Sequence, residues 1–107
     1  SALAAVKCAM TIQASLAQDA GDGSVTVPVQ AKIGIGAGEP VLDGDALFGS
    51  TINLTSRICD HAGPGQILAS RVVRELCMGK GLSFTSLGSI DLKGFDEPTE
   101  VEVVEWR

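Results

Sequence analysis

Apolar and polar residues alternate along the chain with two different periods. In residues 2–18, apolar side chains recur every three or four positions, which predicts a helix of about four turns ending before the DAGDG segment. In residues 24–35, apolar residues stand at every second position, which predicts a strand with one buried face. Pro28 has no amide hydrogen, so strand pairing there is confined to an edge or begins after it.

The remaining sequence continues this mixture of helices and strands. Turn-forming residues in GEPVLDGD, 38–45, predict a hairpin with a short strand around Val41. A helix begins near Ser50 or Thr51 and ends at Gly63, where Pro64 follows. Three further strands are predicted, at 66–70 and within 82–92 and 99–106. Between the first two, a helix capped by Ser70 and ended by Gly79 is expected, and its inward-facing residues are Val72, Val73, Leu76 and Cys77. Intermixed helices and strands indicate an α/β or α+β class.

Composition narrows the class of protein. With 107 residues, 45% of them hydrophobic, the chain is long enough for one small domain. The formal charge of −5 and the scattered Lys and Arg residues disfavour nucleic acid and anionic membranes as partners. Cys8, Cys59 and Cys77 are odd in number and lie among apolar residues, which favours reduced thiols in the core of a cytoplasmic protein. No apolar run approaches the roughly 18 residues of a membrane span.

One pair of polar residues is a candidate binding site. Asn53 and Arg57 lie four residues apart near the start of a predicted helix, so they share one face. An amide and a guanidinium placed together can donate hydrogen bonds to phosphate oxygens or to a developing negative charge. On spacing alone, a solvated helix face explains the pair equally well.

Other candidate groups have simpler explanations. The glycines of GIGAG, 34–38, do not have the spacing of a dinucleotide fingerprint, and close backbone packing within a sheet explains them better. His61 has no second pair of metal ligands near it and is expected to be structural. Glu39, Asp43 and Asp45 match no known cation-binding loop, so a solvated turn is favoured.

An ordered set of short motifs carries a family resemblance. GEPV, FGSTIN, SRIC, GPGQI and LKGF followed by EP occur in this order, and together they resemble the C-terminal half of the catalytic domain of class III adenylate and guanylate cyclases. The resemblance implies an α+β fold with a ferredoxin-like βαββαβ sheet and helices packed on one face. It also implies that residues 1–107 are a single partial domain, without the first strands of the family sheet.

The resemblance assigns a reaction and residues to it. In the family, two domains pair head to tail and bind ATP or GTP between them, and Mg²⁺ or Mn²⁺ activates the ribose 3′ hydroxyl to attack the α-phosphate, giving 3′,5′-cyclic AMP from ATP and releasing pyrophosphate. By resemblance, Asn53 orients the ribose, Arg57 stabilises charge on the phosphate in the transition state, and Lys93 lies near the phosphates. The family's metal-binding aspartates lie upstream of the helix with which this chain begins, so no metal ligand is expected here.

Two questions stay open at this point. The family commonly places Asp or Thr three residues before the Gly of its FG pair to select the base. Ala46 stands there, so either Asp45 reaches the base after a loop shift or base selection is relaxed.

The resemblance leaves two functions open. In the first, the parent protein is an adenylate cyclase in which this chain supplies the Asn/Arg side of the site and is inactive alone. Alternatively, the domain is a catalytically inactive homologue that acts in dimerisation or nucleotide sensing. Either way, we expect the chain to pair with a second copy or with a complementary N-terminal half.

Overall fold

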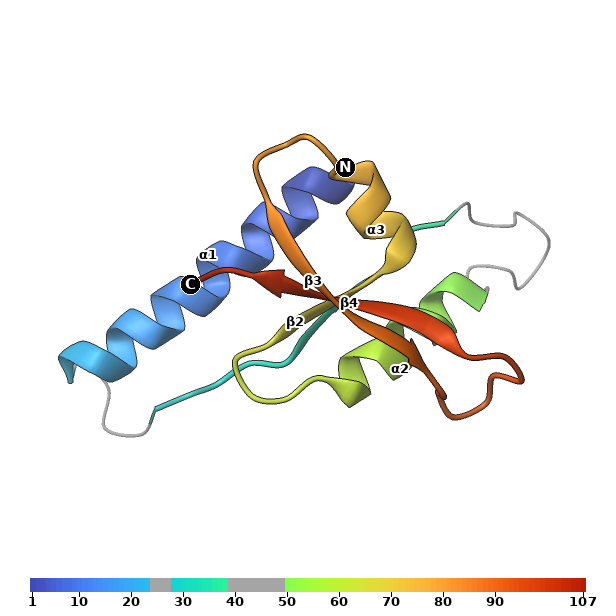
Figure 1. Cartoon of the computed structure of the whole chain (residues 1–107). Helices are drawn as coiled ribbons and strands as arrows, with labels where there is room; N and C mark the ends of the chain where they lie inside the picture. The colour runs from blue at the N-terminus through green and yellow to red at the C-terminus, as the bar shows by residue number, and fades with distance from the viewer. Residues whose placement is uncertain (24–27, 39–49) are drawn as a thin grey trace, which may run out of the picture.

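The computed structural model describes residues 1–23, 28–38 and 50–107 (Figure 1). Its elements are helix α1 (Ala2–Asp22), strand β1 (Ile33–Ile35), helix α2 (Ser50–His61), strand β2 (Ile67–Ser70), helix α3 (Arg71–Leu76), strand β3 (Ser83–Ile90) and strand β4 (Thr99–Glu105). The strands form one sheet in the order β1-β2-β4-β3, in which β1 pairs with β2 in parallel and the other pairs are antiparallel. The predicted α+β class is therefore confirmed.

The described helices cover both faces of the sheet rather than one. Ile67 and Ala69 of β2 pack with α1 and α3, whereas Leu68 between them packs with Ile58 of α2 and with Ala62, which directly follows α2. Figure 1 shows α1 and α3 on one side of the strands and α2 on the other. All of β2 is buried because both faces of this short apolar strand pack against helices. A strand with one solvent-exposed face would alternate apolar and polar residues.

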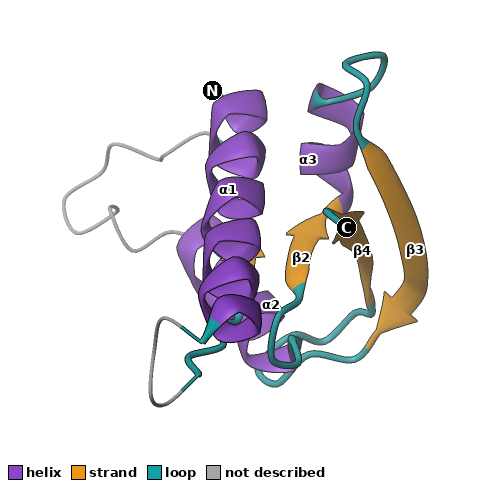
Figure 2. Ribbon diagram, turned by 90° about the vertical axis from the view of Figure 1, so that its left-hand side faces the viewer, coloured by secondary structure: helices purple, strands orange, loops and turns teal. Residues whose placement is uncertain are grey.

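Two predicted elements differ in length from those observed. α1 continues to Asp22 and ends at Gly23, whose φ of 73° is a left-handed conformation that glycine adopts readily. The strand predicted over 24–35 is limited to Ile33–Ile35, while residues 24–27 and the hairpin predicted around Val41 lie outside the described residues. Figure 2 shows α1 alongside β2 and α3, with β3 as the strand farthest from α1.

Helix α3 buries only part of its apolar surface. Val73 and Cys77 are buried as predicted, but Val72 and Leu76 are exposed, because a six-residue helix turns only one face to the sheet. Ser70 precedes the helix as predicted, although its side chain makes no capping hydrogen bond.

The cysteine prediction holds only in part. All three thiols are free: Cys77 is buried, Cys59 half-buried and Cys8 exposed. The assignment of the cysteines to the core is therefore wrong for Cys8, which lies on the solvent face of α1.

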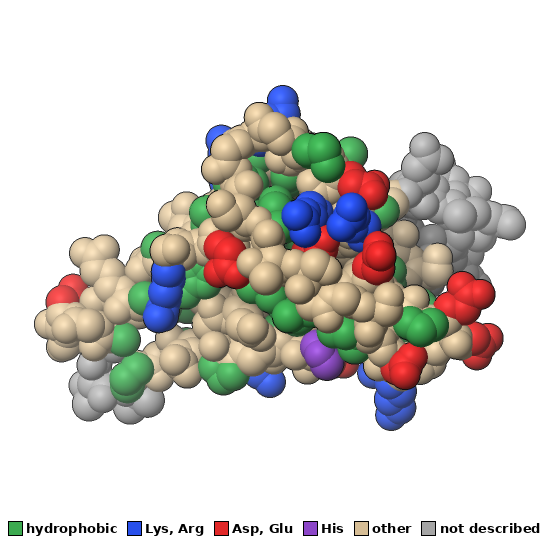
Figure 3. All heavy atoms as spheres, in the orientation of Figure 1, with side chains coloured by type: hydrophobic (Ala, Val, Ile, Leu, Met, Phe, Trp, Pro, Cys, Tyr) green, Lys and Arg blue, Asp and Glu red, His purple; other side chains and the backbone are tan. Residues whose placement is uncertain are grey.

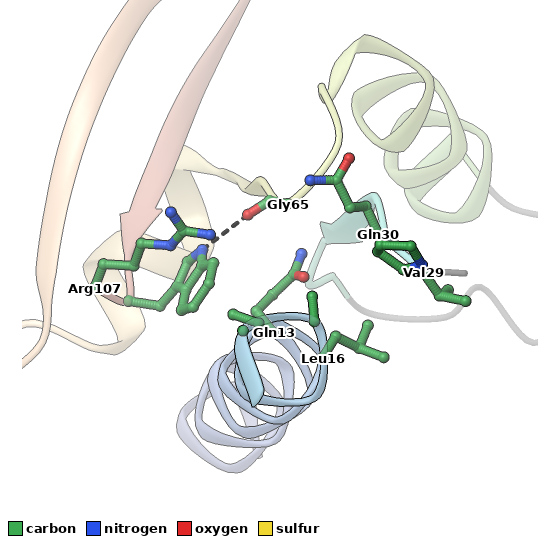
Figure 4. Close-up of a pocket in the computed structure, with 11 residues that line it drawn as sticks. Gln13, Leu16, Val29, Gln30, Gly65 and Arg107 are labelled. Atoms are coloured by element: carbon green, nitrogen blue, oxygen red, sulfur yellow. Dashed lines mark hydrogen bonds between the residues drawn. The ribbon is translucent and has the colours of Figure 1, made fainter. Parts of the chain in front are cut away.

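The turn between α2 and β2 connects three distant parts of the chain. The buried Gln13 of α1 donates from Nε2 to the carbonyl oxygens of Ala31 at 2.9 Å and Gln66 at 3.1 Å. Trp106, which follows β4, donates from Nε1 to the Gly65 carbonyl at 2.8 Å. Figure 4 shows this bond to Gly65 next to Gln13, at the edge of a cavity of about 320 Å³. These bonds fix the C-terminal end of α2 against α1 and β4.

Candidate functional site

The three basic or amide side chains predicted to bind phosphate line one pocket. It has a volume of about 410 Å³ and lies between α2 and the loop that joins β3 to β4. Its lining residues are Ser50, Asn53, Ser56, Arg57, Lys93, Gly94 and Phe95. Asn53 and Arg57 come from α2, whereas Lys93 is 36 positions beyond Arg57 in the sequence and reaches the pocket only through the fold.

Glycines in and after β1 determine how closely α2 approaches the sheet. A Cβ atom placed on Gly34 would lie 2.7 Å from Cβ and 2.8 Å from Cα of Cys59. Gly36 and Gly38 would similarly meet the Oγ1 atoms of Thr55 and Thr51. The three glycines therefore form a smooth surface against one face of α2, so GIGAG serves close packing as predicted, but against a helix rather than within the sheet.

This packing directs the candidate site residues to the opposite side of the helix. Thr51 and Thr55 face β1, and each is followed two positions later by a site residue, Asn53 or Arg57. Two residues span about 200° around an α-helix, so these two side chains point away from the sheet. The small residues on one face of α2 thus place the polar residues of the other face in the pocket.

The loop that carries Lys93 is held by the apolar residues on either side of it. Leu92 is buried and Phe95 is half-buried, and both belong to the cluster around Ile58 of α2. The amide of Phe95 donates to the Leu92 carbonyl at 3.1 Å, and Gly94 has a φ of 89°, which only glycine adopts without strain. Lys93 is exposed at the tip of this turn, beside α2.

The charges of the pocket favour an anionic ligand. Arg57 Nη1 lies 3.4 Å from Asp60 Oδ2; the side chain of Arg57 is half-exposed and that of Asp60 is largely exposed. Within the described ranges, no ion pair is formed by Lys93. Two cations, an amide and two serine hydroxyls can therefore bind phosphate oxygens here. The face drawn in Figure 3 carries its Lys and Arg in small groups among acidic side chains rather than in one stripe.

Several predicted groups fall outside this pocket. Asp45 and Ala46, the candidates for base selection, lie outside the described residues, as do Glu39 and Asp43. His61 is exposed at the last position of α2. Among the residues that the structure describes, no three His, Cys, Asp or Glu side chains are grouped so that they could hold a metal ion. No described helix is both long and apolar enough to cross a membrane.

Some residues of the pocket were not predicted from the sequence. Ser50 and Ser56 line it beside Asn53 and Arg57, and Phe95 forms an apolar wall. Helical spacing is a signal that could have found Ser50, because it lies three positions before Asn53 and seven before Arg57 on the same face. No local pattern marks Phe95, since its position depends on the packing of its loop against α2.

Comparison with known proteins supports a single family. The crystal structure of an adenylate/guanylate cyclase/hydrolase from Silicibacter pomeroyi matches with a TM-score of 0.80 and 30% identity, over 97% of this chain and 62% of that chain. The crystal structure of the adenylyl cyclase CyaB from P. aeruginosa matches with a TM-score of 0.50 and 30% identity, over 53% of this chain and 29% of that chain. The guanylate cyclase soluble subunit beta-2 of Rattus norvegicus is 30% identical over 86 residues, which are 73% of this chain and 12% of that protein.

The family itself is identified over nearly the full chain. A model of the adenylate and guanylate cyclase catalytic domain matches residues 2–105. The match to the Silicibacter structure confirms the cyclase-type sheet expected from the motifs. The chain spans between 12% and 20% of the length of its curated relatives. This domain therefore belongs to the family of adenylate and guanylate cyclase catalytic domains.

Proposed function

We propose that this domain binds the phosphates of ATP in a reaction that forms 3′,5′-cyclic AMP and pyrophosphate. The observation that carries the proposal is the convergence of Asn53, Arg57 and Lys93 on one pocket of about 410 Å³. Membership of the cyclase family supports the reaction class. The chemistry of the pocket also supports it, because two cations and an amide can stabilise the negative charge of a phosphoryl transition state.

Each of the three residues has a distinct role in the proposal. Lys93 and Arg57 bind phosphate oxygens, and the planar guanidinium of Arg57 can donate two parallel hydrogen bonds to one phosphate. Arg57 also stabilises the negative charge that grows on the phosphate as the leaving group departs. The amide of Asn53, one helical turn away, orients the ribose. Asp45 and Ala46 are proposed to influence the choice between adenine and guanine.

Two further components complete the proposed site. Divalent cations, Mg²⁺ or Mn²⁺, are proposed to be held by groups other than the residues that line this pocket. A second copy of the domain, or a complementary N-terminal half, closes the pocket from outside. The exposure of Lys93 and half-exposure of Arg57 are compatible with this arrangement, because both cations remain accessible to a ligand shared with another surface.

The test is the conversion of ATP by the full-length protein with Mg²⁺ or Mn²⁺, with GTP in parallel. Arg57→Ala is expected to lower kcat by about 10²- to 10³-fold, because it removes a donor that acts mainly in the transition state, while KM changes far less. Arg107→Ala, which removes an arginine stacked on Trp106 outside this pocket, is the matched control and should retain activity.

Three outcomes would change the proposal. Equal loss of kcat and of substrate affinity in Arg57→Ala would reduce Arg57 to a binding contact. Activity with GTP alone would reassign the base. Absence of both cyclic nucleotides from the wild-type reaction, together with retained nucleotide binding, would favour the inactive sensing module.

A further inference from the structure

Arg57 is already engaged by a side chain of its own helix. Its Nη1 lies 3.4 Å from Oδ2 of Asp60, three residues further along α2. Asn53 lies one helical turn before Arg57, and Asp60 lies almost one turn after it. The carboxylate therefore attracts the guanidinium towards the C-terminal end of α2, away from Asn53.

This arrangement opposes the geometry that a phosphate needs. A long side chain on a helix normally leans towards the N-terminus, which for Arg57 is the side of Asn53. Bidentate binding of a phosphate needs two guanidinium nitrogens directed to one ligand. Nη1 is directed to Asp60 instead, so Arg57 has to change partner before Nη1 and Nη2 can bind one phosphate together.

We propose that Asp60 is a positioning residue that restrains Arg57 and competes with the phosphates of the ligand for its guanidinium. The inference rests on the proposed function of the pocket. Asp60 is absent from the pocket lining, so it acts on the ligand only through Arg57 and through its charge. A ligand with several negative charges displaces the carboxylate more readily than a ligand with one, because Lys93 adds a second attraction in the same pocket.

The expected size of the effect follows from exposure. The side chain of Arg57 is 42% exposed and that of Asp60 is 66% exposed, so water screens their attraction. Exposed ion pairs of this kind correspond to about a two- to five-fold change in an equilibrium constant. Removing the competing carboxylate should therefore tighten binding by about this factor and no more.

The test is equilibrium binding of ATP and of inorganic pyrophosphate to the full-length protein, measured by isothermal titration calorimetry. Asp60→Asn should bind both ligands about two- to five-fold more tightly than wild type, and the gain should shrink as salt is added. Asp96→Asn is the matched control: it removes the same charge close to Lys93, at an exposed residue that forms no described ion pair with Arg57.

A double-mutant cycle separates competition from a general change in charge. In an Arg57→Ala background, Asp60→Asn should lose its effect, because the carboxylate no longer has a guanidinium to restrain. A gain that persists in this background, or that Asp96→Asn reproduces fully, would overturn the inference in favour of long-range electrostatics. Weaker binding by Asp60→Asn would overturn it in favour of preorganisation by Asp60. If wild type binds neither ligand, the proposed function fails first.

Discussion

At the scale of single residues, one carboxylate is buried inside the fold and depends on its arginine partners. Glu102 of β4 is fully buried, and its Oε1 accepts from Nη1 of Arg74 at 3.0 Å and from Nη1 of Arg71 at 3.2 Å. Its Oε2 is also buried and has no hydrogen-bond partner among the described residues. A buried charge of this kind is tolerated only while its partners are present.

Arg71 of this cluster keeps its charge across physiological pH. The hydrogen bond to Glu102, and then that to Glu75, raises the pKa of Arg71 above its already high ordinary value. A group whose pKa is raised on folding stabilises the fold below its unfolded pKa and loses that contribution only as the pH rises through the folded pKa. Arg71 therefore remains charged at every pH at which this domain is expected to work.

Arg74→Ala is expected to lower the free energy of unfolding by about 1–3 kcal/mol, since Glu102 loses its shorter hydrogen bond inside the fold. Urea unfolding followed by circular dichroism measures this change. Glu75→Gln, which alters an exposed partner of Arg71, should stay within about 0.5 kcal/mol of wild type. If Glu102→Leu combined with Arg74→Ala is no more stable than Arg74→Ala alone, the buried charge is not the cause.

Sequence reasoning found the residues of the pocket more readily than Glu102. Asn53 and Arg57 share a helix, so spacing alone brings them together, and the family motif added Lys93. Glu102 alternates with Val101 and Val103, a pattern that predicts a solvent-facing carboxylate. It is buried instead because α3 packs over that face of β4 and supplies two arginines, a tertiary contact that no local pattern encodes.

At the scale of elements, the packing of α2 on β1 depends on the absence of side chains. Gly34, Gly36 and Gly38 present bare backbone to Cys59, Thr55 and Thr51. Because one side of α2 is held in this way, the position of the site residues on its other side depends on glycines that do not themselves line the pocket.

Gly34→Ala is expected to destabilise the domain by about 1–3 kcal/mol, because its Cβ would meet the backbone of Cys59 and α2 would have to move. Triphosphate affinity should fall as well, as Asn53 and Arg57 move with the helix. Gly21→Ala is the matched control: no atom lies within 4 Å of its added Cβ, so stability should be unchanged or higher by up to about 1 kcal/mol. Chemical unfolding and calorimetric titration of both variants measure these effects. Equal stability of the two variants would show that the contact is not tight.

Whether a segment forms a helix or a strand was predictable from the sequence. Its first and last residues, and which of its faces are buried, were less predictable. The pattern and caps of α2 predicted a helix from Ser50 or Thr51 to Gly63, close to the observed Ser50–His61. The alternation in 24–35 predicted a long strand, yet among the described residues of this range only Ile33–Ile35 pairs, because pairing also requires a neighbouring strand in register. The two-sided covering of β2 likewise depends on where distant helices pack.

At the scale of the whole molecule, the two edges of the sheet are unequal. β3 is a long edge strand with an irregular register between Ser86 and Ser89, a feature that discourages pairing with another chain. β1 has the sequence Ile-Gly-Ile and pairs only with β2 among the described strands. The amide of Ile33 donates to Gln66 on the β2 side, so the amide of Gly34 points to the opposite edge.

We predict that the chain associates through the β1 edge rather than persisting as a free monomer. Sedimentation velocity should show a concentration-dependent increase in mass, and hydrogen exchange at the Gly34 amide should slow over the same range of concentration. Thr85→Lys on the β3 edge should leave both measurements unchanged. A single folded monomer at all concentrations, with rapid exchange at Gly34, would contradict this prediction.

The bond between Trp106 and Gly65 gives the molecule a natural optical probe. The chain contains one tryptophan and no tyrosine, so its near-ultraviolet fluorescence originates in a single indole ring. That ring is tied by its Nε1 to the turn in which α2 ends and β2 begins. The wavelength and anisotropy of its emission therefore report on the junction between β4 and the end of α2, without any attached dye.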